Sequence, residues 1–224
     1  MATACPDALP SRMPPMTRRL PLFALACLAV AATAFAPAPV YKEPKRLGGR
    51  FVTMKTSLGK IKIELFEDKA PVTVKNFLSY VDAKHYDGTV FHRVMPTFTI
   101  AGGGYEKGIS RTTTLQDFKA KERKTKDPIK NEWSNGLLNK RGTIAMAIRG
   151  GLDSATAQFL INVNDNPRLD KGLSDSGFPC CVFGRIIAGM DVIDKIRTVK
   201  TKSIAGFEDV PIDDVVIESV RRGK

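Results

Sequence analysis

Histidine is scarce in this chain of 224 residues, and its scarcity argues against several kinds of catalysis. The two histidines, His85 and His92, belong to no HExxH motif and to no Cys/His cluster at metal-ligand spacing. A Ser-His-Asp triad would need one of them, yet neither lies near a G-x-S-x-G turn. We therefore expect neither metal-dependent hydrolysis nor acyl transfer, and we expect no metal or cofactor.

Signatures of phosphate and nucleic-acid binding are also missing. Residues 102–104 are all glycine, but Lys107 stands where a G-x-G-x-x-G loop needs its third glycine. The formal net charge is +12, yet no basic run is interleaved with aromatic residues. We read the excess charge as a lysine-rich surface and expect no nucleic-acid partner. Binding of an anionic partner by the polar insertion 105–140 stays open as an alternative.

Residues 20–36 form an uncharged run rich in Ala and Leu, directly after Arg18 and Arg19. The run ends in small residues that suit cleavage after Ala34 or Ala36, which is typical of a secretory signal. It is short for a membrane span of about 20 residues. We predict a signal peptide over 1–36, with an uncleaved anchor as the alternative, and export to the periplasm or another extracytoplasmic space. Residues 37–49, with three prolines and a Gly-Gly pair, are predicted to be a linker.

Residues 50–224 carry the pattern of one β-rich domain. Ile61, Ile63 and Leu65 alternate with charged residues, which is the period of a half-buried strand. Leu58-Gly59 is predicted to be the hairpin turn before them. Eight short strands are predicted in all, at 52–55, 60–65, 89–95, 98–100, 143–148, 159–163, 181–187 and 215–220.

Two helices are predicted among these strands. The first begins at Pro71, a residue suited to the first helical position. Its apolar residues recur at i, i+3, i+4 and i+7, namely Val74, Phe77, Leu78 and Val81. The second has the same stripe at Met190, Ile193, Ile196 and Val199. Closely spaced short strands favour a closed sheet, so the expected fold is mainly β, a closed eight-stranded antiparallel barrel capped by two α-helices.

One stretch combines a permanent charge with apolar neighbours. Arg93 lies within the predicted strand 89–95, between Phe91 and Val94, and Phe98 follows after a break at Pro96. A guanidinium is a rigid fork of donors that keeps its charge. The glycine triplet that follows lets another group approach the backbone closely. The stretch therefore predicts an apolar pocket with one strong polar group.

The sequence Phe91-His92-Arg93-Val94 closely resembles the Phe-His-Arg-(Val/Ile) signature of the cyclophilin family of peptidyl-prolyl isomerases. Further similar motifs follow in the family's order, at 142–147, 157–161 and 182–185, so the resemblance covers about 51–222. The segments around 131–132 and 153–156 are more similar to bacterial members. The resemblance implies a cyclophilin-like isomerase domain over 50–224 that acts on proline-containing polypeptides in protein folding. We expect the protein to be a monomer.

The resemblance also implies site residues. Arg93 would be the catalytic arginine. The proline pocket would be lined by Phe98, Met146, Phe159, Leu160 and Leu169. The bound peptide would be flanked by His92, Ala147 and Gln158. For Met146 and Phe159, a role as ordinary core residues stays open.

The chain departs from the family pattern at several positions. Ala101 stands where a glutamine is usual and Leu160 replaces a usual phenylalanine. Both changes keep open a second hypothesis, a proline-peptide binding or chaperone module with weak or no turnover. Cys180 and Cys181 are adjacent, and neighbouring residues of a strand point to opposite faces. An ordinary disulfide is therefore not expected, while a strained vicinal bridge stays open.

Overall fold

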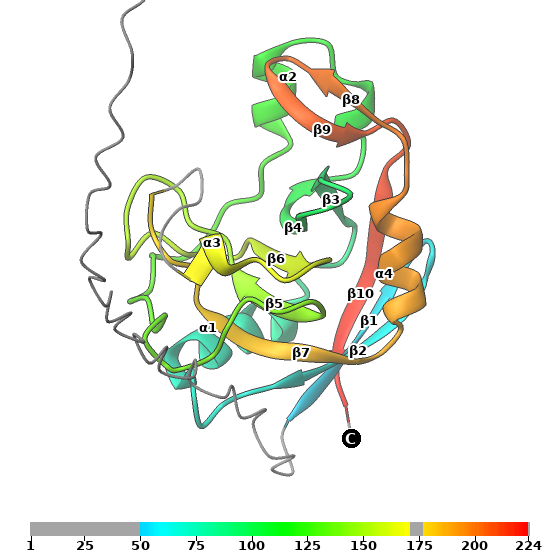
Figure 1. Ribbon diagram of the computed structural model, residues 1–224. Helices are drawn as coiled ribbons and strands as arrows, with labels where there is room; N and C mark the ends of the chain where they lie inside the picture. The colour runs from blue at the N-terminus through cyan, green and yellow to red at the C-terminus, as the bar shows by residue number, and fades with distance from the viewer. Residues whose placement is uncertain (1–49, 171–176, 224) are drawn as a thin grey trace, which may run out of the picture. The chain divides into compact units, whose positions relative to one another are not determined.

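The computed structural model describes residues 50–170 and 177–223, so the predicted signal (1–36) and linker (37–49) lie outside the described residues. Eight antiparallel strands close into a barrel in the order β1-β10-β3-β4-β6-β5-β7-β2 (Figure 1). The strands are β1 (Phe51–Thr56), β2 (Gly59–Leu65), β3 (Thr89–Val94), β4 (Thr99–Glu106), β5 (Thr143–Met146), β6 (Phe159–Asn162), β7 (Val182–Ala188) and β10 (Val215–Arg222). Each matches one of the predicted strands, so the predicted barrel is confirmed.

The first hairpin shows how the sequence pattern produces the barrel. Val52 pairs with Ile63 and Met54 with Ile61 across β1 and β2, and all four side chains are fully buried. Thr53 and Lys62, which lie between them, point to the other face of the sheet, because successive residues of a strand point to opposite faces. Burial of each such apolar side chain stabilises the fold by about 1.5–3 kcal/mol. The alternation therefore fixes which face of the sheet becomes the interior.

Both predicted helices are present as α1 (Pro71–Asp82) and α4 (Met190–Arg197). They bury their apolar stripes in the same core as the barrel interior, α1 next to β10 and α4 next to β2 and β4. Phe77 of α1 lies among the rings of Tyr86, Phe159 and Phe183, at centroid distances of 5.2, 6.1 and 5.1 Å. Within 50–170 and 177–223, no helix is long and apolar enough to span a membrane.

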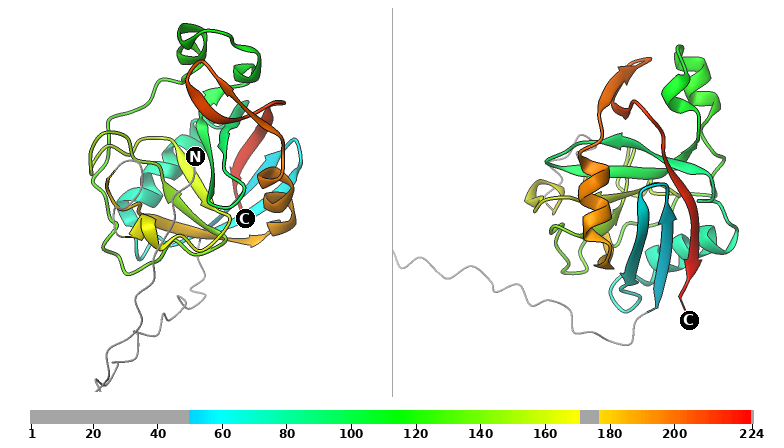
Figure 2. Two further views of the ribbon diagram at one scale, coloured as in Figure 1. Left: turned by 45° about the horizontal axis from the view of Figure 1, so that its top comes forward. Right: turned by 90° about the vertical axis from the view of Figure 1, so that its right-hand side faces the viewer.

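Further elements build a second, smaller core outside the barrel. They are η1 (Ile109–Arg111), α2 (Leu115–Ala120) and the separate hairpin β8 (Thr201–Ile204) and β9 (Phe207–Pro211). Phe118 of α2 stacks on Phe207 with ring centroids 4.0 Å apart, and Ile109 and Val210 are buried beside them. Figure 1 shows α2, β8 and β9 gathered at the top of the view, and Figure 2 shows the same grouping from two other sides. The polar insertion predicted at 105–140 is therefore partly an ordered apolar unit.

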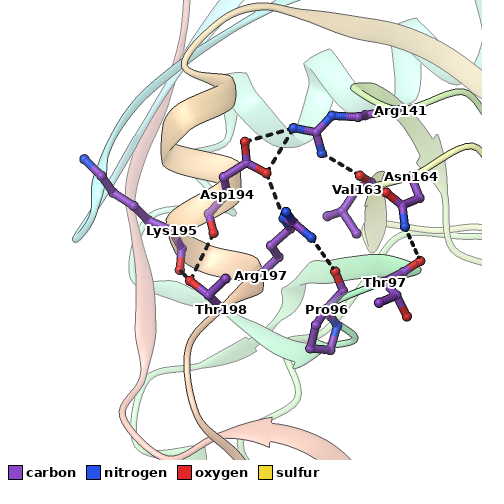
Figure 3. Close-up of polar contacts among 9 residues, drawn as sticks. All are labelled: Pro96, Thr97, Arg141, Val163, Asn164, Asp194, Lys195, Arg197 and Thr198. Carbon is purple, nitrogen blue, oxygen red and sulfur yellow. Dashed lines mark hydrogen bonds and ion pairs between the residues drawn. The ribbon is translucent and has the colours of Figure 1, made fainter.

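The turn between β3 and β4 is tied to α4 by polar contacts (Figure 3). Asp194 accepts a hydrogen bond of 2.7 Å from Nε of Arg197, whose Nη1 donates to the carbonyl of Pro96 at 3.1 Å. Asn164 Nδ2 donates to the carbonyl of Thr97 at 2.9 Å from the other side. Charge-assisted bonds are roughly twice as strong as neutral ones. This turn is therefore fixed at two successive carbonyls.

Candidate active site

A cavity of about 460 Å³ opens beside Arg93, a size typical of ligand pockets. Its walls come from β3, β4, β6, the segment after β5, the short helix α3 (Pro167–Asp170) and the hairpin of β8 and β9. Seven of the nine predicted site residues line it, namely His92, Arg93, Phe98, Ala147, Gln158, Leu160 and Leu169. Residues that are 77 positions apart along the chain thus meet at one concave surface.

A bulge in β3 brings the first two of these residues to the same cavity. Phe91 pairs with Gly102 and Arg93 with Ala101, so β3 has one more residue than β4 across this step, at His92. A bulge re-aims side chains that a regular strand would send to opposite faces. His92 and Arg93 therefore both line the cavity, while Phe91 points into the barrel core.

The glycine triplet lets other side chains lie directly on the backbone of β4. Gly103 has a φ of +84°, and a Cβ there would meet the rings of Phe159 and Tyr86 at 2.8 Å. A Cβ at Gly104 would overlap the side-chain amide of Gln158. The predicted close approach is thus made by Gln158, which packs on the bare backbone at Gly104.

The floor of the cavity is apolar. Leu160 and Leu169 belong to a buried cluster, and Phe98 and Ala101 pack against it as partly exposed members. Leu160 is directly opposite Ala101 in the β4–β6 ladder. A small apolar ring such as that of proline would bury its surface on these side chains without leaving a polar group unpaired.

Met146 and Phe159 lie elsewhere, which corrects the prediction that they line the pocket. Both are fully buried in the barrel core, and Phe159 contacts the rings of Phe77 and Phe91. The reason is the period of the strand, because neighbours on β6 point to opposite faces. Leu160 lines the cavity, so Phe159 points inward, and Met146, its cross-strand partner, follows it.

The amide of Gln158 is fixed by two residues that the sequence analysis did not single out. Arg149 Nη2 donates to Gln158 Oε1 at 3.0 Å, and Gln158 Nε2 donates to Glu122 Oε1 at 3.3 Å. Arg149 also donates to Glu122 at 2.8 Å and to the Tyr105 hydroxyl at 3.1 Å. No sequence motif links these residues. Glu122 follows α2 and Arg149 follows β5, and only folding brings the two segments together.

His92 is a neutral part of the wall. Its side chain is buried, with 8% of the residue exposed, and its ring lies 4.8 Å from that of Tyr105. Burial, followed by the charges of Arg149 and Arg93, lowers the pKa of His92 from 6.5 to about 3. Its Nδ1 is buried without a hydrogen-bond partner among the described residues. The ring therefore carries no charge at neutral pH.

The two cysteines face different environments, as their adjacency predicted. Cys180 lines the cavity and packs with Leu160 and Leu169, whereas Cys181 belongs to the barrel core. Both are free thiols. Burial raises the pKa of Cys180 to about 12 and that of Cys181 to about 11. At neutral pH both are protonated and behave as small apolar groups.

The hairpin of β8 and β9 forms a wall that was not predicted from the sequence. Gly206, Phe207 and Glu208 line the cavity. The next residue, Asp209, places Oδ2 3.5 Å from Nε of Arg93. The one guanidinium predicted to do the chemistry thus has a carboxylate beside it.

Comparison with known proteins shows the family of the chain. Residues 51–222 match the family described as cyclophilin type peptidyl-prolyl cis-trans isomerase/CLD. The chain is 50% identical over 170 residues to peptidyl-prolyl cis-trans isomerase B of Escherichia coli, covering 75% of this chain and 97% of that protein. It is 49% identical over 175 residues to a peptidyl-prolyl cis-trans isomerase of Acinetobacter baylyi, covering 78% and 86%. A cyclophilin type isomerase of Cryptosporidium parvum, 24% identical, shares the fold with a TM-score of 0.62 over 79% of this chain and 98% of its own. The protein belongs to the cyclophilin-type peptidyl-prolyl cis-trans isomerases.

Proposed function

We propose that this isomerase accelerates rotation about X-Pro bonds by directing the Arg93 guanidinium at the prolyl nitrogen of the twisted amide. The observation that carries the proposal is that Arg93 and the apolar side chains of Phe98, Leu160 and Leu169 line one cavity. The described lining residues include two arginines, Arg93 and Arg149. A proline ring seated on the apolar floor would bring its amide next to the guanidinium of Arg93.

The physics of the reaction asks for such an arrangement. Amide resonance sets a barrier of about 18–20 kcal/mol to rotation. At the top of the barrier the amide is twisted, the resonance is lost, and the nitrogen becomes pyramidal with a lone pair. A charged donor aimed at that lone pair stabilises the twisted state more than either planar form, and only such differential binding speeds the reaction.

The remaining wall residues would hold the peptide rather than react with it. Gln158, whose amide is already oriented by Arg149 and Glu122, would hydrogen-bond the substrate backbone. His92 and Ala147 would flank the chain on either side of the proline. Rotation makes and breaks no covalent bond, so a neutral His92 is compatible with the reaction.

Substrates and location are also part of the proposal. The clients are proline-containing segments of unfolded or folding polypeptides, and the enzyme acts on them as a monomer. The predicted signal at 1–36 would deliver it to the periplasm, where such polypeptides emerge. Fusing residues 1–49 to a reporter that is active only outside the cytoplasm tests this step, and an inactive but expressed fusion would contradict it.

Exchange kinetics on a proline peptide test the mechanism. Replacing Arg93 by Ala should lower kcat/KM about 10²–10³-fold, the loss typical of removing one charge-stabilising donor from an active site. Peptide affinity should change only a few fold, because the donor acts mainly in the twisted state. Arg111→Ala, which removes an exposed arginine of η1, is the matched control.

The same assay separates the proposal from its alternative. A purified protein that binds the peptide yet leaves the exchange rate unchanged would be a binding module. A protein that catalyses exchange as well after Arg93→Ala would be an isomerase with another mechanism.

A further inference from the structure

The side chain directly across the ladder from Arg93 cannot hydrogen-bond. In the β3–β4 register Arg93 is opposite Ala101, which offers only a methyl group. Arginine has several rotatable bonds, so a guanidinium that must point at one atom needs a partner to restrain it. A side chain from another element can provide this restraint.

Such a partner comes from the hairpin beside the barrel. Asp209 Oδ2 lies 3.5 Å from Nε of Arg93, and the two side chains are 34% and 37% exposed. Both side chains are thus half-buried, Arg93 in the lining of the cavity and Asp209 directly after the lining residue Glu208. An ion pair in this position is screened only in part by water, and a peptide in the cavity would exclude more of that water and strengthen the pair.

The backbone of Asp209 is well anchored in an unusual conformation. Its φ is +59°, in the left-handed region that few residues other than glycine adopt. The next residue, Val210, is fully buried in the smaller core and pairs with Lys202 across the hairpin. A conformation of this kind persists where the surroundings fix it, and such residues cluster at functional sites.

Resting on the function proposed above, we propose that Asp209 is a positioning residue for Arg93. The carboxylate holds the Nε edge of the guanidinium. The N–H groups of the two terminal nitrogens are separate donors of the same rigid fork. Fixing the Nε edge therefore sets the direction of the terminal N–H groups. It also reduces the rotational freedom that Arg93 loses when the twisted amide is bound.

The test uses steady-state exchange kinetics on the full chain with Asp209→Asn. Asparagine is close in shape and tolerates the left-handed backbone, so the change removes the charge alone. We expect kcat to fall about three- to tenfold, as for loss of a half-exposed ion pair. KM should change less than about twofold, because the ground state does not depend on the direction of the fork. Asp213→Asn, at an exposed position just after β9, is the control with the same change of charge and should leave kcat unaltered.

A rescue experiment separates positioning from a merely structural role. A glutamine at position 101 would place an amide oxygen opposite Arg93, so Ala101→Gln should recover much of the kcat lost in Asp209→Asn while raising that of the unaltered enzyme less. Asp209→Gly, which fits the backbone without strain, should reproduce the Asn result and shows that any loss is due to the missing carboxylate.

Each outcome is decisive. If Asp209→Asn and Asp209→Gly keep full kcat, or raise it, while Arg93→Ala lowers turnover as expected, the positioning role is wrong and the proposed function stands. If Arg93→Ala keeps full turnover, the proposed function fails first. A loss that Ala101→Gln leaves unrelieved would overturn the positioning role as well.

Discussion

Gln158 Oε1 lies 3.0 Å from Nη2 of Arg149, so the residue proposed to hold the peptide backbone is itself held by a cation. The same arginine also reaches Glu122 and the hydroxyl of Tyr105. One side chain from the segment after β5 thus joins β4, the residue just before β6 and the segment after α2. This relationship makes Arg149 the first target for substitution.

Replacing Arg149 by Met should weaken substrate binding more than turnover. The change removes the donor that orients Gln158 but keeps an apolar stem of similar length. The Arg149 side chain is 52% exposed. We therefore expect a loss of about 1–1.5 kcal/mol, or roughly tenfold in kcat/KM. Most of it should appear in KM, since a contact made equally in both states changes KM alone. Arg111→Met is the control, and an unchanged KM would show that Gln158 needs no support.

Replacing Gly104 by Ala should disturb the same glutamine from the other side. The added methyl would overlap the Gln158 amide and push it away from Arg149. We expect a loss of about 1–3 kcal/mol in the free energy of unfolding, as is usual for overpacking, together with a higher KM. Urea denaturation and peptide kinetics measure the two effects.

Gly151 provides the matched control for this change. A Cβ at Gly151 would meet nothing within 4 Å, and its φ is not in the left-handed region. Gly151→Ala should therefore leave stability and KM nearly unchanged. Equal effects of the two substitutions would mean that the packing of Gln158 on Gly104 has no energetic weight.

Stability should fall as the pH drops from about 6.5 toward 3, in part because of His92. The pKa of His92 is about 3 in the folded protein and 6.5 ordinarily. In this interval the unfolded chain binds a proton that the folded one excludes, so the contribution of a neutral His92 is complete above pH 6.5 and declines below it. Between pH 7.5 and 4.5 the loss should be about 2–3 kcal/mol. Urea denaturation at the two pH values measures it.

A variant isolates this effect from other titrating groups. His92→Asn cannot take up the proton, so its stability should change less between pH 7.5 and 4.5 than that of the unaltered protein. The pKa of His85 is also lowered by burial, and therefore some pH dependence should remain in the variant. Identical pH profiles for both proteins would show that His92 titrates normally in the fold.

The cysteines should be unreactive in the folded protein. Because burial raises both thiol pKa values to about 12 and about 11, the thiolate fraction at pH 7.5 is very small. We expect iodoacetamide to label neither Cys180 nor Cys181 in native protein within the time that labels both in urea. Mass measurement with and without reductant should give one mass. A mass about 2 Da lower without reductant, and labelling only after reduction, would reveal the vicinal disulfide instead.

The barrel was predictable because each of its strands has a recognisable pattern within a short stretch of sequence. Alternation at Ile61, Ile63 and Leu65 gives both the strand and its buried face, and the stripe of α1 gives a helix that must cover an apolar surface. Closure followed from the number of short strands. These features depend on residues within a few positions of each other, which is what periodicity can detect.

The parts of the site that were missed depend on long-range packing. Phe159 and Leu160 are neighbours in sequence, and only the register of β6 decides that Leu160 faces the cavity. α2 is a helix of 6 residues, too short to show a periodic stripe. No motif in the sequence marks Arg149, and only the fold brings it next to Gln158. A residue type predicts chemistry, but its partners appear only in the folded chain.

The stacked rings of Phe118 and Phe207 have a consequence for how the entrance of the cavity can change between related proteins. The β8–β9 hairpin, which borders the cavity, forms its own two-stranded sheet. The insertion 105–140 packs against this hairpin through the aromatic contact. Lengthening or shortening the insertion would thus reshape the entrance while the cylinder of strands beneath keeps its ladder intact. The range of polypeptides that enter the cavity can therefore change while the apolar side chains of its floor stay the same.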